Sequence, residues 1–273
     1  MRHGLVFAVA LLGACSDARR PTSGGDGFVT PTVDGSSFDL SNSFDPPTAR
    51  VYAHSASALY SIDPDTLALT AIGPFKWPSG SDEMTDIALD KDGNMFGISA
   101  DRVWSIDVTT AKCTFLSNFQ GNQFNGLSFI AADQTAGGAE ILVGAAQDGS
   151  VYRIDSTSGA QVLLGSYGSS YGSSGDLVSV QGSTYATTSR ASDAYDSLVK
   201  VDAATGKATL IGSTGTNQIW GLGYWKQKLF GFTQLSGMVL IDINTGKATP
   251  IAGGGSISWY GAGVTTSAPI TIN

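Results

Sequence analysis

One short pattern occurs five times along the chain and limits the folds that the chain can adopt. Each copy has two apolar or aromatic residues, a variable residue, an aliphatic residue and Asp, and a Thr or Ser follows three positions after the Asp. The copies begin at Leu59, Val103, Val151, Leu198 and Met238, so they are 44, 48, 47 and 40 residues apart. A repeat of about 40 to 50 residues predicts an architecture in which similar small units pack side by side.

Further strand-like segments, with a period of two, accompany every copy. This period excludes a solenoid of helical hairpins, whose apolar residues would recur about every 3.6 positions. The segments that precede the last four copies are 85–89 and 94–98, 126–129 and 140–144, 176–179 and 183–187, and 221–224 and 228–232. With the two strands of the copy itself, each repeat has four strands. The sequence therefore predicts an all-β fold, a five-bladed β-propeller with four strands per blade.

The two ends of the repeat region predict how the ring closes. Only residues 50–54 precede the first copy as a strand, whereas residues 260–264 match the pattern of an innermost strand and have no blade after them. We therefore expect the C-terminal strand to join the first blade, which removes open sheet edges. The predicted propeller domain covers residues 48–273.

The Asp of each copy is expected to shape a turn. Its carboxylate can accept hydrogen bonds from turn N–H groups, and Gly four positions later supplies a positive φ. Leu67 and Ala111 replace that Gly in the first two copies, so their turns are expected to differ slightly. Because the five Asp residues belong to five blades, we expect no metal and no cofactor there. His54 is the one histidine outside the N-terminal segment, too few for a His-rich metal site.

The N-terminus has the pattern of an export signal. An apolar run over residues 4–12 is too short to cross a bilayer as a stable helix. It leads into Leu-Gly-Ala-Cys at residues 12–15, which resembles the bacterial lipobox. The resemblance implies that residues 1–14 are a lipoprotein signal peptide and that Cys15 is lipidated and anchors the protein to a membrane.

The residues after the lipobox predict a tether and a location. Residues 15–47 are rich in Ser, Asp, Gly, Thr and Pro, a composition typical of disordered linkers. Ser16 follows the lipidated position, and in the enteric sorting rule a residue other than Asp there permits export to the outer membrane. We therefore expect a cell-envelope protein, lipid-anchored on the periplasmic or surface face of the outer membrane.

The charge and the cysteine content limit the kinds of partner that the chain is expected to have. The chain has 15 basic and 23 acidic residues and a net charge of −8, and no run of Lys or Arg. A nucleic-acid partner is therefore not expected. With Cys15 lipidated, Cys113 has no disulfide partner and is expected to be a small core residue. We expect a monomer.

The repeats resemble those of a broad group of bacterial propeller proteins, whose units follow the pattern Tyr-x-Ile-Asp-x-x-Thr-Gly. The resemblance covers about four-fifths of the chain. It implies the fold alone, because propellers carry binding, scaffolding and enzymatic functions.

Candidate binding residues lie in the segments that lead into the innermost strands, because propeller ligands usually bind at the mouth of the central channel. Amide groups beside aromatic rings suit a sugar, whose C–H groups pack on the ring and whose hydroxyls pair with the amides. The residues concerned are Gln123, Asn125, Gln218, Trp220, Trp259 and Tyr260. The alternative, which the sequence favours over a ligand role, is that Trp220, Trp259 and Phe124 fill the core between blades.

Candidate catalytic residues are Asp86 and Asp176, at equivalent positions two blades apart, with Glu83 nearby. A pair of carboxyl groups about 5–10 Å apart could hydrolyse a glycosidic bond. The chain contains only two Glu residues, however, and no full glycosidase motif. The alternative is that the two Asp side chains cap the entries of their strands.

The first functional hypothesis is therefore a lipoprotein that presents its propeller as a non-enzymatic binding module for a glycan or a protein. Two alternatives remain: a carbohydrate-active hydrolase that uses the channel carboxylates, and a passive envelope scaffold.

Overall fold

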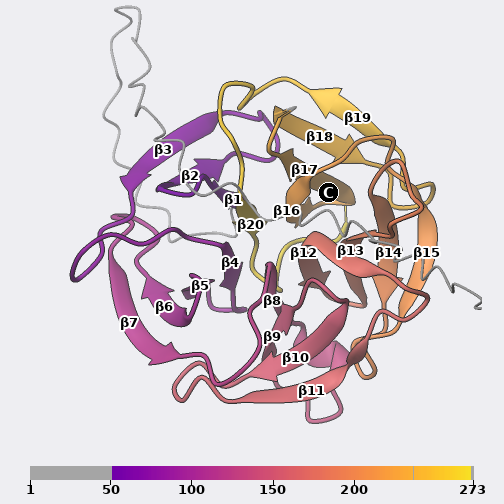
Figure 1. Ribbon diagram of the computed structural model, residues 1–273. Helices are drawn as coiled ribbons and strands as arrows, with labels where there is room; N and C mark the ends of the chain where they lie inside the picture. Colours follow the sequence, from indigo (N-terminus) through magenta and orange to yellow (C-terminus); the bar gives the residue numbers. More distant parts are fainter. Residues whose placement is uncertain (1–50, 236, 272–273) are drawn as a thin grey trace, which may run out of the picture. The chain divides into compact units, whose positions relative to one another are not determined.

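The structure, a computed structural model, describes residues 51–235 and 237–271. The predicted signal peptide, the Cys15 anchor and the tether lie outside these residues. Within the described residues, twenty strands form five antiparallel sheets of four strands, which stand around one axis (Figure 1). A short 3-10 helix, η1 (Ala132–Gln134), follows β8.

Each sheet is a blade whose strands run in sequence order from the axis to the rim, apart from the first. The first blade consists of β20 (Gly261–Gly263), β1 (Val51–His54), β2 (Ala58–Ile62) and β3 (Leu69–Pro74). The second consists of β4 (Asp86–Leu89), β5 (Met95–Ile98), β6 (Arg102–Ile106) and β7 (Cys113–Asn118). The third consists of β8 (Gly126–Ile130), β9 (Ile141–Ala145), β10 (Ser150–Ile154) and β11 (Gln161–Ser166).

The remaining strands form two more blades of the same kind. The fourth consists of β12 (Gly172–Val180), β13 (Ser183–Ser189), β14 (Ser197–Val201) and β15 (Ala208–Ser213). The fifth consists of β16 (Ile219–Trp225), β17 (Lys228–Thr233), β18 (Gly237–Ile241) and β19 (Ala248–Ile251). No helix among the described residues is long and apolar enough to span a membrane.

The ring closes as the sequence predicts. The C-terminal strand β20 pairs antiparallel with β1, with Ala262 opposite Ala53 and Gly261 opposite His54. It supplies the innermost strand of the first blade, and Figure 1 shows it beside β1 near the centre of the ring. The fold is a five-bladed β-propeller.

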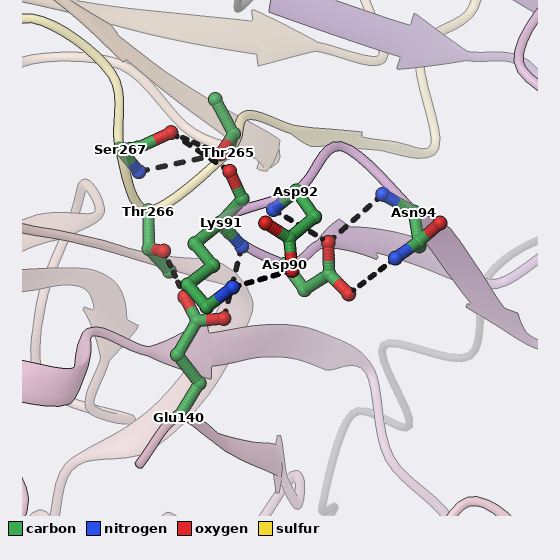
Figure 2. Close-up of polar contacts among 8 residues, drawn as sticks. All are labelled: Asp90, Lys91, Asp92, Asn94, Glu140, Thr265, Thr266 and Ser267. Atoms are coloured by element: carbon green, nitrogen blue, oxygen red, sulfur yellow. Dashed lines mark hydrogen bonds and ion pairs between the residues drawn. The ribbon is translucent and has the colours of Figure 1, made fainter. Parts of the chain in front are cut away.

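A polar cluster fixes the chain after β20 to the second and third blades (Figure 2). The Glu140 carboxylate accepts a hydrogen bond from the Lys91 backbone N–H at 2.9 Å and another from the Thr266 hydroxyl. The Ser267 hydroxyl donates to the Lys91 carbonyl oxygen at 3.0 Å. We call Lys91, Glu140, Thr266 and Ser267 the closure cluster, since they tie the C-terminal segment to two other blades.

The repeated Asp residues shape turns, which confirms the structural role predicted for them. In the fourth blade, Asp202 Oδ1 accepts from the backbone N–H groups of Ala204 at 3.0 Å and Thr205 at 2.9 Å. The Gly206 N–H donates to the Asp202 carbonyl oxygen at 2.8 Å. The same three contacts recur in the other four blades, at Asp63, Asp107, Asp155 and Asp242.

The prediction that the first two turns differ is wrong for the backbone. Leu67 has φ 63° and Ala111 has φ 55°, the same left-handed conformation as Gly206 at φ 70°. The two N–H groups still donate to the carbonyl oxygens of Asp63 at 2.8 Å and Asp107 at 2.9 Å. The hydrogen bonds of the turn therefore impose the left-handed conformation even where a side chain makes it unfavourable.

Glycine permits close contact between neighbouring blades at these turns. A Cβ atom on Gly159 would lie 1.8 Å from the carbonyl oxygen of Asn118 in the second blade. A Cβ atom on Gly165 would lie 1.7 Å from the carbonyl oxygen of Thr205 in the fourth blade. β7 and β11, the outer strands of the second and third blades, are thus each in van der Waals contact with the turn of the next blade.

Candidate functional site

The segments that lead into the innermost strands contact one another across blade boundaries, as their predicted position at the axis requires. Asn125 Nδ2 donates to the Ser173 carbonyl oxygen at 2.9 Å, which joins the third blade to the fourth. The Trp220 and Tyr260 rings pack edge to face with their centroids 5.4 Å apart, which joins the fifth blade to the first. Of the predicted binding residues, the structure therefore brings Trp220 and Tyr260 into contact with each other.

The aromatic candidates are packed inside the protein. Trp259 has no exposed surface, and its ring packs against Tyr60 at 5.3 Å and Phe232 at 5.5 Å between the centroids. Trp220 is 7% exposed and Tyr260 is 8% exposed. Trp259 is a core residue in this arrangement, and the other two rings show only a small edge to solvent.

The amide candidates Gln123 and Gln218 are more accessible than the rings, and the backbone of Gln218 is strained. Gln123 is exposed and Gln218 is half-buried. Gln218 has φ 58°, an unfavourable conformation for a residue with a side chain. Its carbonyl oxygen accepts from the Gln234 N–H at 3.2 Å, and the neighbouring Asn217 Nδ2 donates to the Ala194 carbonyl oxygen at 3.0 Å.

The two residues bonded to that segment, Ala194 and Gln234, each precede a residue with an exposed apolar side chain. Tyr195, next to Ala194, is 48% exposed, and Leu235, next to Gln234, is 80% exposed. We call Tyr195, Asn217, Gln218 and Leu235 the loop patch. Sequence analysis did not identify Tyr195 or Leu235, although an aromatic residue within the polar stretch 190–196 is a signal that could have indicated the first.

A buried carboxylate holds the loop patch in place. Asp196 Oδ2 accepts from the Ile219 N–H at 3.0 Å, and the Thr214 hydroxyl donates to the Asp196 carbonyl oxygen at 2.8 Å. Burial raises the pKa of Asp196, while the bond from Ile219 opposes that shift. The loop that carries Tyr195 is therefore attached to the segment before β16 by backbone and side-chain bonds.

The two Asp residues proposed for catalysis are fully buried. Asp86 Oδ2 accepts from the Leu127 N–H at 2.7 Å, and Asp176 Oδ2 accepts from the Leu222 N–H at 2.6 Å. Burial is the main cause that raises the pKa of Asp176 well above the usual range of a carboxyl group, and the nearby charge of Asp86 is the second. Glu83, in contrast, is exposed.

This geometry favours the structural alternative for the two Asp side chains over the catalytic one. A glycosidase needs both carboxyl groups to reach a glycosidic bond. Asp86 and Asp176 have no exposed surface and bond to the backbone of the neighbouring blade, so a substrate would reach them only if the innermost strands separated.

Titratable groups elsewhere offer little further chemistry. Among residues 51–235 and 237–271, no three His, Cys, Asp or Glu side chains are grouped so that they could hold a metal ion. Cys113 is buried, as predicted, and burial raises the pKa of its thiol to about 12. A thiol in that state is a poor nucleophile, since the thiolate is the reactive form.

Comparisons with known proteins support the fold and indicate no function. No family model matches the sequence, and no curated protein matches it. The chain is similar to a chain in a crystal structure of a nidogen/laminin complex, with a TM-score of 0.51 and 8% identity over 82% of this chain and all of that one. It is also similar to a protein of unknown function from Bacteroides caccae, with a TM-score of 0.42 and 8% identity over 74% of this chain and 71% of that one. At 8% identity, the likeness to the chain of the nidogen/laminin complex shows the fold alone.

Proposed function

We propose that this chain is a lipid-anchored envelope protein whose propeller is a non-catalytic module that binds another protein through the loop patch. The observation that carries the proposal is the pair of exposed apolar side chains, Tyr195 and Leu235, each of which follows a residue that is hydrogen-bonded to Asn217 or Gln218. Tyr is enriched among the residues that dominate protein–protein binding energies. A rigid surface also loses little conformational entropy on binding.

A protein ligand suits this surface better than a glycan. Sugars stack on the exposed face of an aromatic ring, and Tyr195 is the one ring that the loop patch offers, because Trp220 and Tyr260 show less than a tenth of their surface. Leu235 offers apolar area without a ring or a hydrogen-bonding group. The amide groups of Asn217 and Gln218 would add polar contacts at the rim of a protein interface.

The anchor is the second part of the proposal, and its support comes from residues 12–15. A lipid on Cys15 and a tether up to residue 47 would hold the propeller close to the membrane that carries its partner. Intact mass analysis of membrane-extracted protein is expected to show an acyl adduct on Cys15. A Cys15→Ala variant that stays in the membrane fraction would contradict the anchor.

Site-specific photocrosslinking in the intact envelope tests the binding site. A photoreactive residue at position 195 is expected to yield a discrete adduct, whereas one at Phe115, an aromatic residue with similar exposure (44%) on β7, serves as the matched control. A Leu235→Ser substitution should then reduce the yield at position 195 without unfolding the protein. Equal adducts at both positions, or an adduct that Leu235→Ser leaves unchanged, would contradict the proposed site.

A glycan array with the purified protein tests the alternative. A saturable glycan hit that Tyr195→Ala abolishes would replace the protein ligand with a glycan at the same patch. A hit that Tyr195→Ala leaves intact would move the binding site elsewhere on the propeller.

A further inference from the structure

The outermost strand of each blade is an open sheet edge. β3, β7, β11, β15 and β19 each stand at the end of their sheet, and Figure 1 shows them around the rim of the ring. Along such an edge, one row of backbone N–H and C=O groups has no partner within the sheet, so another strand can pair with it. The five outer edges can therefore be compared with one another as candidate interaction surfaces.

The third blade differs from the other four at one position of its outer strand. Seven residues after the turn Asp, β11 has Val162, which lies opposite Arg153 of β10. The same position in the other blades, with the same register toward the third strand, is occupied by Thr in every case: Thr70, Thr114, Thr209 and Thr249. Val has no hydroxyl group that could bind water, so β11 is the most apolar of the five edges at this position.

Both faces of β11 expose an apolar side chain at this point. Val162 is 64% exposed and Leu163 is 59% exposed. Successive residues of a strand project from opposite faces of the sheet, so the two side chains lie on different faces of the edge. On β7 and β15, by contrast, one large apolar side chain, Phe115 or Leu210, is exposed beside a Thr. A strand that pairs with β11 would cover both faces at once, whereas a helix would cover one.

The residues of β11 leave the strand free to pair. It contains no Pro and no charged residue, whereas β19 has Pro250, which lacks a backbone N–H. Pro and charged side chains are among the devices by which edge strands avoid pairing with other chains. At the start of β11, Gln161 is fixed by hydrogen bonds with the backbone of Asn122. Near its end, Gly165 contacts the turn of the fourth blade, so the open part of the edge is 161–163.

We propose that β11 binds β11 of a second copy of this chain, in an antiparallel pair centred on Val162. In that pair Val162 lies opposite its own copy, and Leu163 lies opposite Gln161 of the second chain, so both chains contribute the same residues. Because the strand is uncharged, two copies bring no like charges together. Sequence analysis predicts a monomer, and this contact would replace that prediction. The proposal depends neither on the anchor nor on the loop patch.

The contact is small, so the dimer should form and separate with concentration. The open residues of the two edges bury less than the about 1,600 Å² of a standard stable interface. The edge is already ordered, because β11 is paired along β10 and Gln161 is bonded to Asn122, which limits the conformational entropy lost on binding. We therefore expect a monomer at low concentration and a dimer at high concentration.

Disulfide trapping in a full chain with Cys15→Ala tests the pair, since Cys113 is buried. Residues directly opposite in an antiparallel pair have Cα atoms about 4.5–5.5 Å apart, within the about 4.4–6.8 Å that a disulfide bridges. Val162→Cys should therefore give a covalent dimer under mild oxidation. Thr209→Cys is the matched control, because Thr209 is exposed at the same position of β15, and it should stay monomeric. Equal yields of dimer from the two variants, or none from Val162→Cys, would overturn the proposal.

Sedimentation velocity of the Cys15→Ala chain tests the association without a covalent bond. The fraction of dimer should rise with protein concentration. Val162→Thr, which introduces the residue of the other four blades, should raise the dissociation constant at least about tenfold, because it places a hydroxyl group in the contact. Leu210→Thr on β15 is the matched control and should leave the constant unchanged, and circular dichroism checks that both variants fold.

Two results would refute pairing between copies. The first is a chain that stays monomeric at every concentration, or a dimer that Val162→Thr leaves intact. The second is a photoreactive residue at position 162 that, in the intact envelope, yields an adduct with a different protein and none with a second copy, because the strand bound at β11 would then be foreign.

Discussion

The Thr266 hydroxyl donates a hydrogen bond to the Glu140 carboxylate, although 126 positions separate the two residues. This bond attaches the segment after β20 to the third blade, while β20 itself belongs to the first. Glu140→Gln removes the charge from an acceptor that also receives the Lys91 N–H, so we expect a loss of about 1–3 kcal/mol in the free energy of unfolding. Urea denaturation measures the loss.

Glu83→Gln is the control for the Glu140 substitution, because Glu83 is exposed and outside the closure cluster. It should change the free energy of unfolding by less than about 0.5 kcal/mol. Equal effects of the two substitutions would mean that the closure cluster contributes nothing specific.

Removal of the C-terminal strand should destabilise the whole propeller. A chain that ends at Ser258 lacks β20 and the fully buried Trp259, and it leaves β1 as an open edge. We expect a loss above about 4 kcal/mol, which at about 2–4 °C per kcal/mol lowers Tm by about 10 °C or more. Calorimetry measures Tm, and a chain that lacks only residues 271–273 is the control. A truncated protein that melts like the parent would refute closure by β20.

Gly159→Ala should destabilise the contact between the second and third blades. Its Cβ atom would lie 1.8 Å from the Asn118 carbonyl oxygen, and its φ of 71° already disfavours a side chain. Gly182→Ala is a matched control, because Gly182 has φ 73° and open space around the new Cβ atom. We expect about 1 kcal/mol for the control and clearly more, about 3 kcal/mol, for Gly159→Ala. Equal losses in urea denaturation would show that the contact between blades is not tight.

Cys113 should stay unreactive while the protein is folded. Burial raises the pKa of its thiol to about 12, so at pH 8 only about one thiol in ten thousand is ionised. In a Cys15→Ala variant, where Cys113 is the remaining cysteine, iodoacetamide is expected to label the chain only after denaturation. Mass spectrometry of samples labelled with and without urea measures this, and rapid labelling of the folded protein would contradict the buried position.

The turn carboxylates should make the stability of the propeller depend on pH. Hydrogen bonds from the Thr205 hydroxyl and backbone lower the pKa of Asp202, and equivalent bonds lower those of Asp107, Asp155 and Asp242. Such groups contribute stability above the ordinary pKa of Asp, which is lost as the pH falls through the lowered value. We expect stability to decline below about pH 4, and Asp202→Asn should make this decline shallower in acid titrations followed by circular dichroism. If Asp202→Asn leaves the loss of stability at low pH unchanged, other groups cause that loss.

The fold could be predicted from the sequence because its signals are local. The five copies, their turns with Asp and the extra strand at residues 260–264 each depend on residues close together in the chain. Sequence reasoning was wrong about Leu67 and Ala111, where the hydrogen bonds of the turn prevail over the preference of a single residue.

The arrangement of side chains between blades was decided by the tertiary structure. The sequence does not reveal that Asp86 and Asp176 are fully buried, or that both accept bonds from a neighbouring blade. Nor does it reveal that Trp259 is buried while Tyr195 and Leu235 are exposed. Repeats determine the blades because strand pairing is local in the chain. Contacts between blades join residues more than 40 positions apart, such as Asp86 and Leu127, and depend on how the closed ring packs.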